Sequence, residues 1–390
     1  MTAPMNDRLP PHSDPARDDV APSGDRTSLF EFDMPSLVSE VEAMGLPRRT
    51  APQLFKWLYE KGVSDISLMT DLSQNARAQI EARFSTLQGS IVRHQVASDD
   101  TQKLLIEWGE TERTFDEGSR NESSLRLSGG DATRQTETVL IPTSDRKTAC
   151  VSSQIGCPVG CKFCASGIGG LDGNLSAGRI VEQVWRCARL EGVGRVSNVV
   201  FMGMGEPLAN FNNVTQAIRT INAEWGLGVG ARKITVSTVG LPSAIRKLCT
   251  LDIPVTLALS LHAPFDELRR EIIPWAEYST IAELLDACQE WFNKTGREIT
   301  LEYILLGGVN DRREHAEELA RLARSMRANV NLIRYNEVDG LPFMRPTGDA
   351  VHAFQEVLHN GRVNSHIRAS RGRDIAAACG QLRHESRAKS

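Results

Sequence analysis

The sequence predicts an α/β protein in which a partial (β/α)6 barrel of the TIM type follows a small N-terminal helical accessory domain. Two observations support this fold class. From residue 147 onward, short apolar segments of strand length alternate with longer segments whose apolar residues recur at helical spacing. Such alternation is typical of a parallel sheet covered by helices. The chain of 390 residues, 41% of them hydrophobic, is also long enough to bury one large core of this kind.

The part of the chain before the barrel divides into segments of different character. Residues 1–27 are rich in proline and charge and have few large apolar side chains, so we expect a disordered tail. Leu37, Val41 and Met44 then recur at helical spacing, and Gly45 follows as a stop signal. The expected segments are the tail (1–27), a helical accessory domain (28–92), a β-rich linker (93–146) with a polar loop or hairpin tip at 110–136, the barrel (147–383) and a basic tail (384–390).

The barrel segment gives the strand and helix positions. In barrels of this type the chemistry lies at the C-terminal ends of the strands, so polar residues that follow a strand are the first candidates for a site. The expected strands are 148–153, 198–203, 232–238, 254–260, 298–305 and 329–335, with a last one at 364–369, and the expected helices include 176–191, 211–224, 279–294, 311–326 and 348–359.

Charge and composition restrict the classes of protein. The net charge of −4 does not indicate nucleic acid, although residues 361–390 hold seven Arg or Lys against two acidic residues. That basic stretch is either a solvated helix end or a rim that faces phosphates. Eight cysteines are too few for a disulfide scaffold, no apolar run reaches membrane-spanning length, and the first residues lack a signal-peptide pattern. We therefore expect a cytoplasmic protein with no membrane attachment.

Three cysteines, Cys157, Cys161 and Cys164, form the strongest motif in the chain. One short loop can turn three thiolates toward a single object, and thiolates are the usual ligands of iron–sulfur clusters. Three ligands suit a 4Fe-4S cluster with one iron left open for a substrate or cofactor. The alternative is structural zinc, which needs four ligands, usually as two separated pairs, and no fourth Cys or His lies in the loop.

With Phe163 before the third cysteine, the loop resembles that of the radical S-adenosylmethionine (radical SAM) superfamily. The resemblance implies that the open iron binds SAM and that one electron from the cluster cleaves a carbon–sulfur bond to give a 5′-deoxyadenosyl radical. The run at 203–207 on its own is an ordinary loop, but at the end of the second barrel strand it resembles the motif that holds the amino group of SAM. Gly205 and Glu206 are the contacts that this likeness implies.

Cys150 and Cys379 narrow the resemblance further. Each alone is typical of a buried apolar cysteine. Together with the three clustered cysteines they resemble the RlmN/Cfr family of RNA methyltransferases, and the likeness covers residues 28–383. It rests on the segments 149–164, 198–208, 233–240, 258–264, 331–336 and 374–382, and on 53–57 in the accessory domain, which we expect to bind RNA.

The family resemblance implies a reaction that uses two SAM molecules. Carbon 2 and carbon 8 of adenine are electron-poor, so they cannot attack the methyl group of SAM directly. Cys379 is implied to take a methyl group from the first SAM, and the radical made from the second removes a hydrogen from that methyl. The methylene radical adds to the base, Glu137 accepts a proton as general base, and Cys150 attacks the sulfur of Cys379 to release the product through a disulfide.

The resemblance also assigns further contacts and partners. The implied partners are 23S ribosomal RNA, with tRNA as a second substrate, and an electron donor of the flavodoxin or ferredoxin type, and the protein is expected to act as a monomer. The implied SAM contacts, besides Gly205 and Glu206, are Ser237, Ser260, Leu261, His262 and Asn336.

The family resemblance leaves two methylation products possible. RlmN-type members methylate carbon 2 of adenosine and Cfr-type members methylate carbon 8. Residues 331–336 are nearer to the Cfr pattern, and Glu337 stands where members usually have proline. The accessory domain fits RlmN, so carbon 2 is our first prediction. A radical SAM enzyme with a small-molecule substrate is the more remote alternative, because most such enzymes need no methyl-carrying cysteine.

Overall fold

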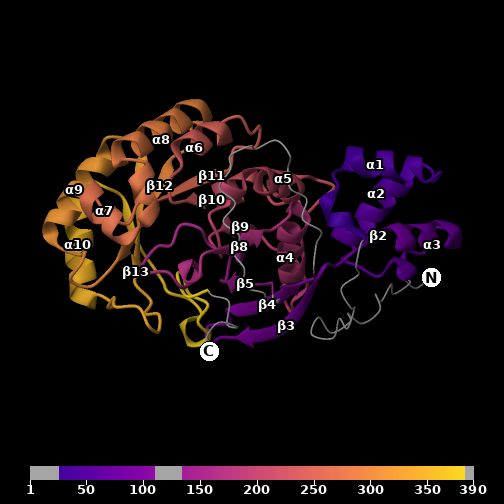
Figure 1. The fold of residues 1–390 in the computed structure, drawn as a ribbon, viewed down its shortest axis with the longest axis horizontal. Helices are drawn as coiled ribbons and strands as arrows, with labels where there is room; N and C mark the ends of the chain where they lie inside the picture. Colours follow the sequence, from indigo (N-terminus) through magenta and orange to yellow (C-terminus); the bar gives the residue numbers. More distant parts are fainter. Residues whose placement is uncertain (1–25, 110–133, 383–390) are drawn as a thin grey trace, which may run out of the picture.

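The computed structural model describes residues 26–109 and 134–382. The predicted tails at 1–27 and 384–390 and the predicted loop at 110–136 lie almost wholly outside these ranges. In the described part, ten strands form one sheet, with the order β14-β13-β12-β11-β10-β9-β6-β5-β4-β3 (Figure 1). The molecule is elongated, with the barrel at one end and the N-terminal helices at the other.

The barrel consists of seven parallel strands, each paired with the next in sequence. Helices connect them and cover the outer side of the sheet, which confirms the predicted partial barrel. The strands are β6 (Lys147–Cys150), β9 (Asn198–Phe201), β10 (Ile234–Thr238), β11 (Thr256–Ser260), β12 (Ile299–Leu305), β13 (Ala328–Arg334) and β14 (Ser365–Arg368), and the helices are α4 (Ala177–Arg189), α5 (Phe211–Asn222), α6 (Pro242–Leu248), α7 (Asp266–Ile272), α8 (Ile281–Thr295), α9 (Arg313–Arg324) and α10 (Gly348–Asn360).

The first barrel strand is shorter than the sequence predicts. The expected strand at 148–153 ends at Cys150, and the chain then turns into a small antiparallel hairpin of β7 (Gln154–Gly156) and β8 (Leu171–Asn174). The apolar pattern continues past Cys150 because Val151 is still buried, and its N–H still donates to the Val200 carbonyl at 3.0 Å although the regular strand has ended. The hairpin frames the loop that carries the three clustered cysteines.

An antiparallel extension continues the barrel sheet at its first edge. β3 (Gly89–Val96), β4 (Gln102–Trp108) and β5 (Gln135–Pro142) follow one another and join the barrel through the β5–β6 pair. The predicted β-rich linker is therefore part of the main sheet. β3 also begins inside the range predicted to be helical, since the helical pattern ends with α3 (Gln74–Arg83).

The N-terminal helices pack directly against the barrel. They are α1 (Met34–Ala43), α2 (Thr50–Phe55), a five-residue π-helix η2 (Lys56–Glu60) and α3. A capping box of Asp33 and Ser36 starts α1, and Gly45, with φ of 73°, follows its end. Trp185 of α4 donates its indole N–H to the Leu58 carbonyl at 2.7 Å. One continuous hydrophobic cluster runs from the N-terminal helices through the barrel.

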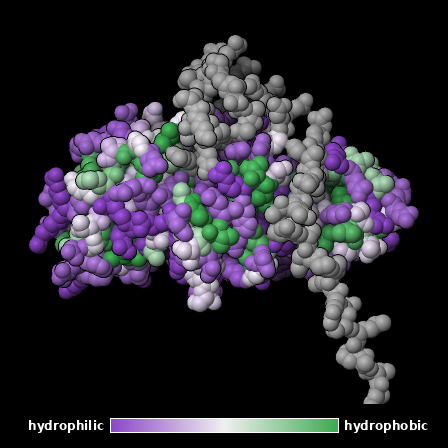
Figure 2. All heavy atoms as spheres, turned by 90° about the horizontal axis from the view of Figure 1, so that it is seen from below, coloured by the Kyte–Doolittle hydropathy of each residue, from purple (hydrophilic) through white to green (hydrophobic). Residues whose placement is uncertain are grey.

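Within residues 26–109 and 134–382, no helix is both long and apolar enough to cross a membrane. On the face shown in Figure 2, hydrophobic residues lie in small groups among hydrophilic ones. Isolated groups of this size are normal for a globular surface.

Candidate active site

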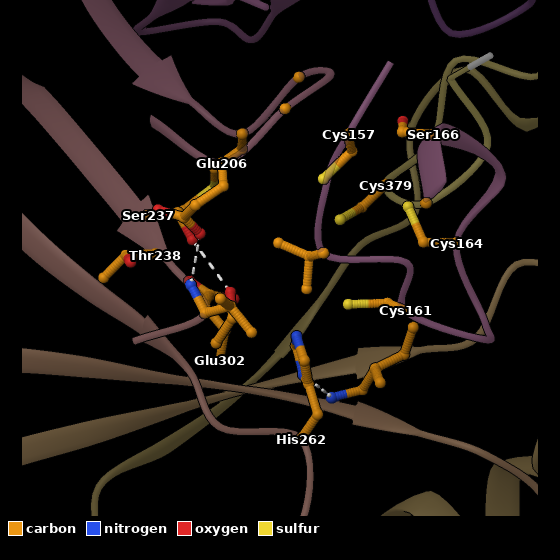
Figure 3. A pocket seen from close by; sticks show the side chains of 18 of the residues that line it. Cys157, Cys161, Cys164, Ser166, Glu206, Ser237, Thr238, His262, Glu302 and Cys379 are labelled. Atoms are coloured by element: carbon orange, nitrogen blue, oxygen red, sulfur yellow. Dashed lines mark hydrogen bonds between the residues drawn. The ribbon is translucent and has the colours of Figure 1, made fainter. Parts of the chain in front are cut away.

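A cavity of about 140 Å³ lies at the C-terminal ends of the barrel strands, as the barrel rule predicts. The loop after the first strand, the ends of β10, β11 and β12, and the segment that follows β14 all contribute to its wall (Figure 3). The predicted site residues that line it are Cys157, Cys161, Cys164, Gly205, Glu206, Ser237, Ser260, His262 and Cys379. Leu261, Asn336, Cys150 and Glu137 lie outside this lining.

The backbone of the cysteine loop explains its local sequence. Gly156 has φ of 74°, and a Cβ atom there would lie 2.1 Å from the Gly170 carbonyl oxygen, so only glycine fits. The Cys157 N–H donates to that same carbonyl at 2.9 Å, and the Cys164 N–H donates to the Cys161 carbonyl at 3.1 Å. These bonds fold the loop so that all three thiols face the cavity.

The environment of the three thiols suits a cluster better than a single ion. Burial raises the pKa of Cys157 to about 12 and that of Cys161 well above its usual value, so the free thiols are protonated. Metal binding therefore has to displace their protons. In the described ranges no three His, Cys, Asp or Glu side chains converge on one ion position. Three thiols on one side of a cavity, too far apart to share one ion, can hold a larger iron–sulfur unit at three of its corners.

Glu206 is buried and ties the second and third barrel strands together. Its carboxylate accepts the Leu208 N–H at 2.9 Å and the Val239 N–H at 2.8 Å. Burial raises its pKa, and these hydrogen bonds act in the opposite direction. Because each carboxylate oxygen has a second lone pair, Glu206 can still accept a further donor from the cavity. Gly205, with φ of 103°, leaves no room for a side chain beside Gln154.

His262 is held in place as a neutral side chain. Its backbone is left-handed, with φ of 60°, and its Nδ1 accepts the Ile304 N–H at 3.1 Å. Burial, aided by the Arg269 charge, lowers its pKa to about 3. A neutral ring that accepts at Nδ1 carries its proton on Nε2. The ring also meets Phe163 edge-on, with 5.2 Å between centroids, so it packs beneath the cysteine loop.

Of the other predicted cofactor contacts, some line the cavity and some lie behind its wall. The Ser237 and Ser260 hydroxyls lie 3.2 Å apart on the cavity wall. Leu261 is fully buried, and its carbonyl accepts a hydrogen bond from the Arg269 guanidinium. The Asn336 amide nitrogen donates to the Cys379 carbonyl at 3.4 Å. Asn336 therefore touches the loop that carries Cys379 and is not itself part of the cavity lining.

Cys379 and Cys150 come from opposite ends of the barrel sequence. Cys379 follows the last strand and turns into the cavity, where the residue is exposed. The protein atoms around its sulfur still reduce hydration and raise the pKa of the thiol to about 11, although the Arg368 guanidinium opposes the rise. Cys150 ends β6, where burial and the nearby Cys379 raise its pKa to about 12. Both are free thiols.

Glu137 is more buried than a strand-end carboxylate would be. It lies on β5 with only 2% of its surface exposed. Its Oε1 lies 2.7 Å from the ammonium group of Lys103, which is equally buried on the neighbouring strand β4. The predicted base is thus part of an ion pair beside the cavity.

Sequence reasoning missed two charged residues of the cavity wall, Glu302 and Arg368. Arg368 Nη1 lies 3.9 Å from Glu302 Oε2, and Asn331 donates to the other carboxylate oxygen at 3.0 Å. The available signal was a single charge within an otherwise apolar strand, since Glu302 interrupts β12.

Two family models match this chain. The radical SAM superfamily matches residues 151–323, and the N-terminal domain of the ribosomal RNA large subunit methyltransferase matches residues 27–85. The crystal structure of a radical SAM methyltransferase from Sphaerobacter thermophilus superposes with a TM-score of 0.84 at 39% identity, and the match covers 92% of this chain and 99% of that one. Fold and site thus define a radical SAM enzyme.

Proteins of similar sequence show to which family of radical SAM enzymes the chain belongs. A probable dual-specificity RNA methyltransferase RlmN from Gloeobacter violaceus is 43% identical over 89% of this chain and 92% of its own length. One from Rhodopirellula baltica is 40% identical over 92% of this chain and 91% of its own length. The chain belongs to the RlmN family of radical SAM RNA methyltransferases, which confirms the resemblance drawn from its motifs.

The cofactors of the superfamily are a 4Fe-4S cluster and SAM, and the cavity suits both. The three thiols gather on one side of it, as a cluster ligand set requires. Glu206 and Ser237 lie across the cavity from the thiols (Figure 3). With Ser260, which also lines the cavity, they offer hydrogen-bond partners for a polar cofactor.

Proposed function

We propose that this protein methylates carbon 2 of an adenosine in 23S ribosomal RNA, and of an adenosine in tRNA, with two molecules of SAM per product. The observation that carries the proposal is that the Cys379 thiol lines the same cavity as Cys157, Cys161 and Cys164. A methyl group on that sulfur would lie where radicals are made. The relatives are named dual-specificity RNA methyltransferases, which supports RNA of two kinds as substrate.

The proposed roles follow from side-chain chemistry. When bound, the cluster and SAM supply the electron, the methyl group and the adenosyl radical. Cys379 carries the methyl group and, as a thiolate, takes it by displacement. Arg368 supports that thiolate because its positive charge counteracts the effect of burial on the pKa. Glu137 accepts the proton that leaves the nucleobase once the adduct has given one electron to the bound cluster. Cys150 then attacks the sulfur of Cys379, so that the disulfide forms, the bond from that sulfur to the methylene carbon breaks, and this carbon takes up a proton to become the methyl group.

The target adenosine has to leave its stack to reach the cavity. Enzymes that modify a base take it out of the helix or use an unpaired one. The N-terminal helices, which match an rRNA methyltransferase domain, are the proposed RNA-binding part. We further propose a cytoplasmic monomer that receives electrons from a flavodoxin- or ferredoxin-type donor.

Methylation of carbon 8 is the second candidate, and one contact favours keeping it. Glu337, which departs from the family pattern, accepts a hydrogen bond from Gln381 through its carbonyl at 3.0 Å. Its carboxylate also accepts the Arg345 N–H at 3.2 Å. The backbone at this position therefore contacts the segment that holds Cys379, and a shift of that backbone would change how the methyl group meets the nucleobase.

The test is mass spectrometry of nucleosides from 23S rRNA and tRNA treated with the anaerobically reconstituted enzyme and SAM. We expect 2-methyladenosine in both RNAs, and none with Cys379→Ala. Formation of 8-methyladenosine would move the protein to the second candidate. Cleavage of SAM with no methylated adenosine would refute the proposal as a whole.

A further inference from the structure

Lys103 and Glu137 form a buried ion pair next to the proposed reaction site. Lys103 lies on β4 and Glu137 on β5, and their side chains are 4% and 3% exposed. The ammonium nitrogen lies 2.7 Å from the carboxylate Oε1. A short, charge-assisted contact of this kind fixes the direction of both groups.

The same ammonium group also reaches the segment that carries Cys379. Lys103 Nζ donates to the Ala376 carbonyl oxygen at 3.3 Å. Ala376 has φ of 50°, a left-handed conformation that is costly for a residue other than glycine. A conformation of this kind persists where its surroundings hold it, and Lys103 is one of those surroundings. One side chain thus joins Glu137 to a point three residues before Cys379.

Further contacts bind the β3–β4 turn to the same segment without using a buried charge. The Ser98 N–H donates to the Asp374 carboxylate at 2.8 Å, and the Gly372 N–H donates to the Asp99 carboxylate at 3.2 Å. Attachment of the segment therefore does not depend on Lys103 alone. Neutral or exposed groups would have been enough for that purpose.

Stability is also a poor explanation for the buried pair. Two charges removed from water lose hydration, and their attraction often only repays that loss, so apolar residues of similar volume commonly serve as well. A buried Lys–Glu pair beside a proposed proton acceptor is better explained by what it does for the carboxylate. The ammonium group holds the carboxylate in one direction, which a general base requires to reach the proton it accepts.

We propose that Lys103 is a positioning residue of the methyl-transfer reaction. It holds the general base Glu137 at a fixed position relative to the segment that carries Cys379. The inference rests on the proposed function of Glu137 and Cys379. Lys103 then acts in the step after the RNA has been joined to Cys379, when a proton passes from the adenine to Glu137. Methylation of Cys379 itself and cleavage of SAM do not need that proton transfer.

The experiment measures how fast the covalent link between Cys379 and RNA resolves, by denaturing gel and nucleoside mass spectrometry, in the reconstituted enzyme. For Lys103→Met we expect product release to slow about 10- to 100-fold, and the linked species to accumulate, because a poorly held base loses part of its usual effect. SAM cleavage stays within about twofold of wild type. Lys103→Arg, which keeps the charge, recovers most of the rate.

A double mutant separates positioning from general structural damage. If Lys103 acts through Glu137, then Lys103→Met added to Glu137→Gln slows release no further than Glu137→Gln alone, within about twofold. Asp374→Ala is the matched control, since it removes another attachment of the same segment and leaves the ion pair intact. It should release product at the wild-type rate.

Each result either supports or overturns the inference. Release at the wild-type rate in Lys103→Met, additive effects in the double mutant, or an equal defect in Asp374→Ala would each refute it. If Lys103→Met does not fold, as judged by iron content and thermal unfolding, the comparison of Lys103→Arg with Lys103→Gln decides, with Gln expected to be the slow one. If wild type makes no methylated adenosine and Cys150→Ala traps no RNA, the proposed function itself has failed.

Discussion

The three clustered cysteines and the pair of Cys150 and Cys379 lie close together in the fold. The two groups differ in which parts of the sequence they come from. The three lie within one eight-residue loop, and its shape depends largely on neighbours close in sequence, such as Gly156 before it and the Gly170 carbonyl after it. The pair comes from the first barrel strand and from the segment after the last one. The cluster site is therefore a local structure, whereas the methyl-transfer site forms only when the barrel closes.

The two regions nevertheless touch. The Ala165 N–H, next to Cys164, donates to the Gly380 carbonyl at 2.8 Å. The Ser166 hydroxyl donates to the Leu382 carbonyl at 2.6 Å. The segment that holds Cys379 is therefore attached to the end of the cysteine loop on one side and to the β3–β4 turn on the other. Substitutions in the cysteine loop and around the Cys379 segment can measure how far each of these regions depends on the other.

The largest effect is expected from Cys161→Ala. With two thiols left, the cluster lacks a ligand, so bound iron, SAM cleavage and RNA methylation should all fall, the last by about 10³-fold or more. If the regions are built separately, the Cys379 thiol should still react with iodoacetamide at the rate of the wild-type protein stripped of its cluster. A changed rate would mean that the loop cysteines also shape the second region.

Arg269→Met should give the next largest effect, on stability. Arg269 is 1% exposed, and its guanidinium donates to the carbonyls of Leu261 and Val239 beneath the cysteine loop. Without it, buried carbonyl groups lose their partners, at a cost of about 3 kcal/mol in the free energy of unfolding. Urea unfolding of the cluster-free protein would measure this. Arg246→Met, at an exposed arginine on α6, is the control and should change stability by less than about 1 kcal/mol.

His262→Asn tests whether the buried His262 is neutral, through the pH dependence of the free energy of unfolding. The folded pKa of His262 is lowered to about 3 from 6.5, so between these values the unfolded chain binds the extra proton. The free energy of unfolding of the wild type should therefore fall as pH drops below about 6.5. In His262→Asn, where the amide oxygen can still accept the Ile304 N–H, the fall between pH 6 and pH 5 should be smaller by about 1 kcal/mol. Equal slopes would contradict a neutral buried imidazole.

The smallest effect is expected from Ser166→Ala, which removes the hydroxyl bond to Leu382 between the two regions. Loss of one neutral hydrogen bond should cost about 1 kcal/mol locally. Iron content and SAM cleavage should stay at wild-type levels, and methylation of Cys379, followed by mass spectrometry of the protein, should slow about fivefold. Loss of iron in this variant would show that the contact supports the cluster loop instead.

Much of the fold could be predicted from the sequence because its signals are local. The strands from β9 to β14 and most helices lie within a few residues of their predicted positions, since the period of apolar residues records which side of each element is buried. The first strand was wrong beyond Cys150, because Val151 is still buried and still hydrogen-bonded to β9 where the regular strand has ended. The joining of β3–β5 to the barrel could not be predicted, since register between separate segments leaves no periodic trace.

By itself the sequence determined the cluster loop, the barrel and the family, because cysteine spacing, glycine positions and apolar periods act over a few residues. Only the tertiary structure decided that Cys379 would enter the cavity of the cysteine loop, that Lys103 would pair with Glu137, and that Glu302 and Arg368 would line the wall. These contacts join residues far apart in the chain. Their partners are chosen by how the closed sheet packs, and that choice depends on the free energy of the whole fold.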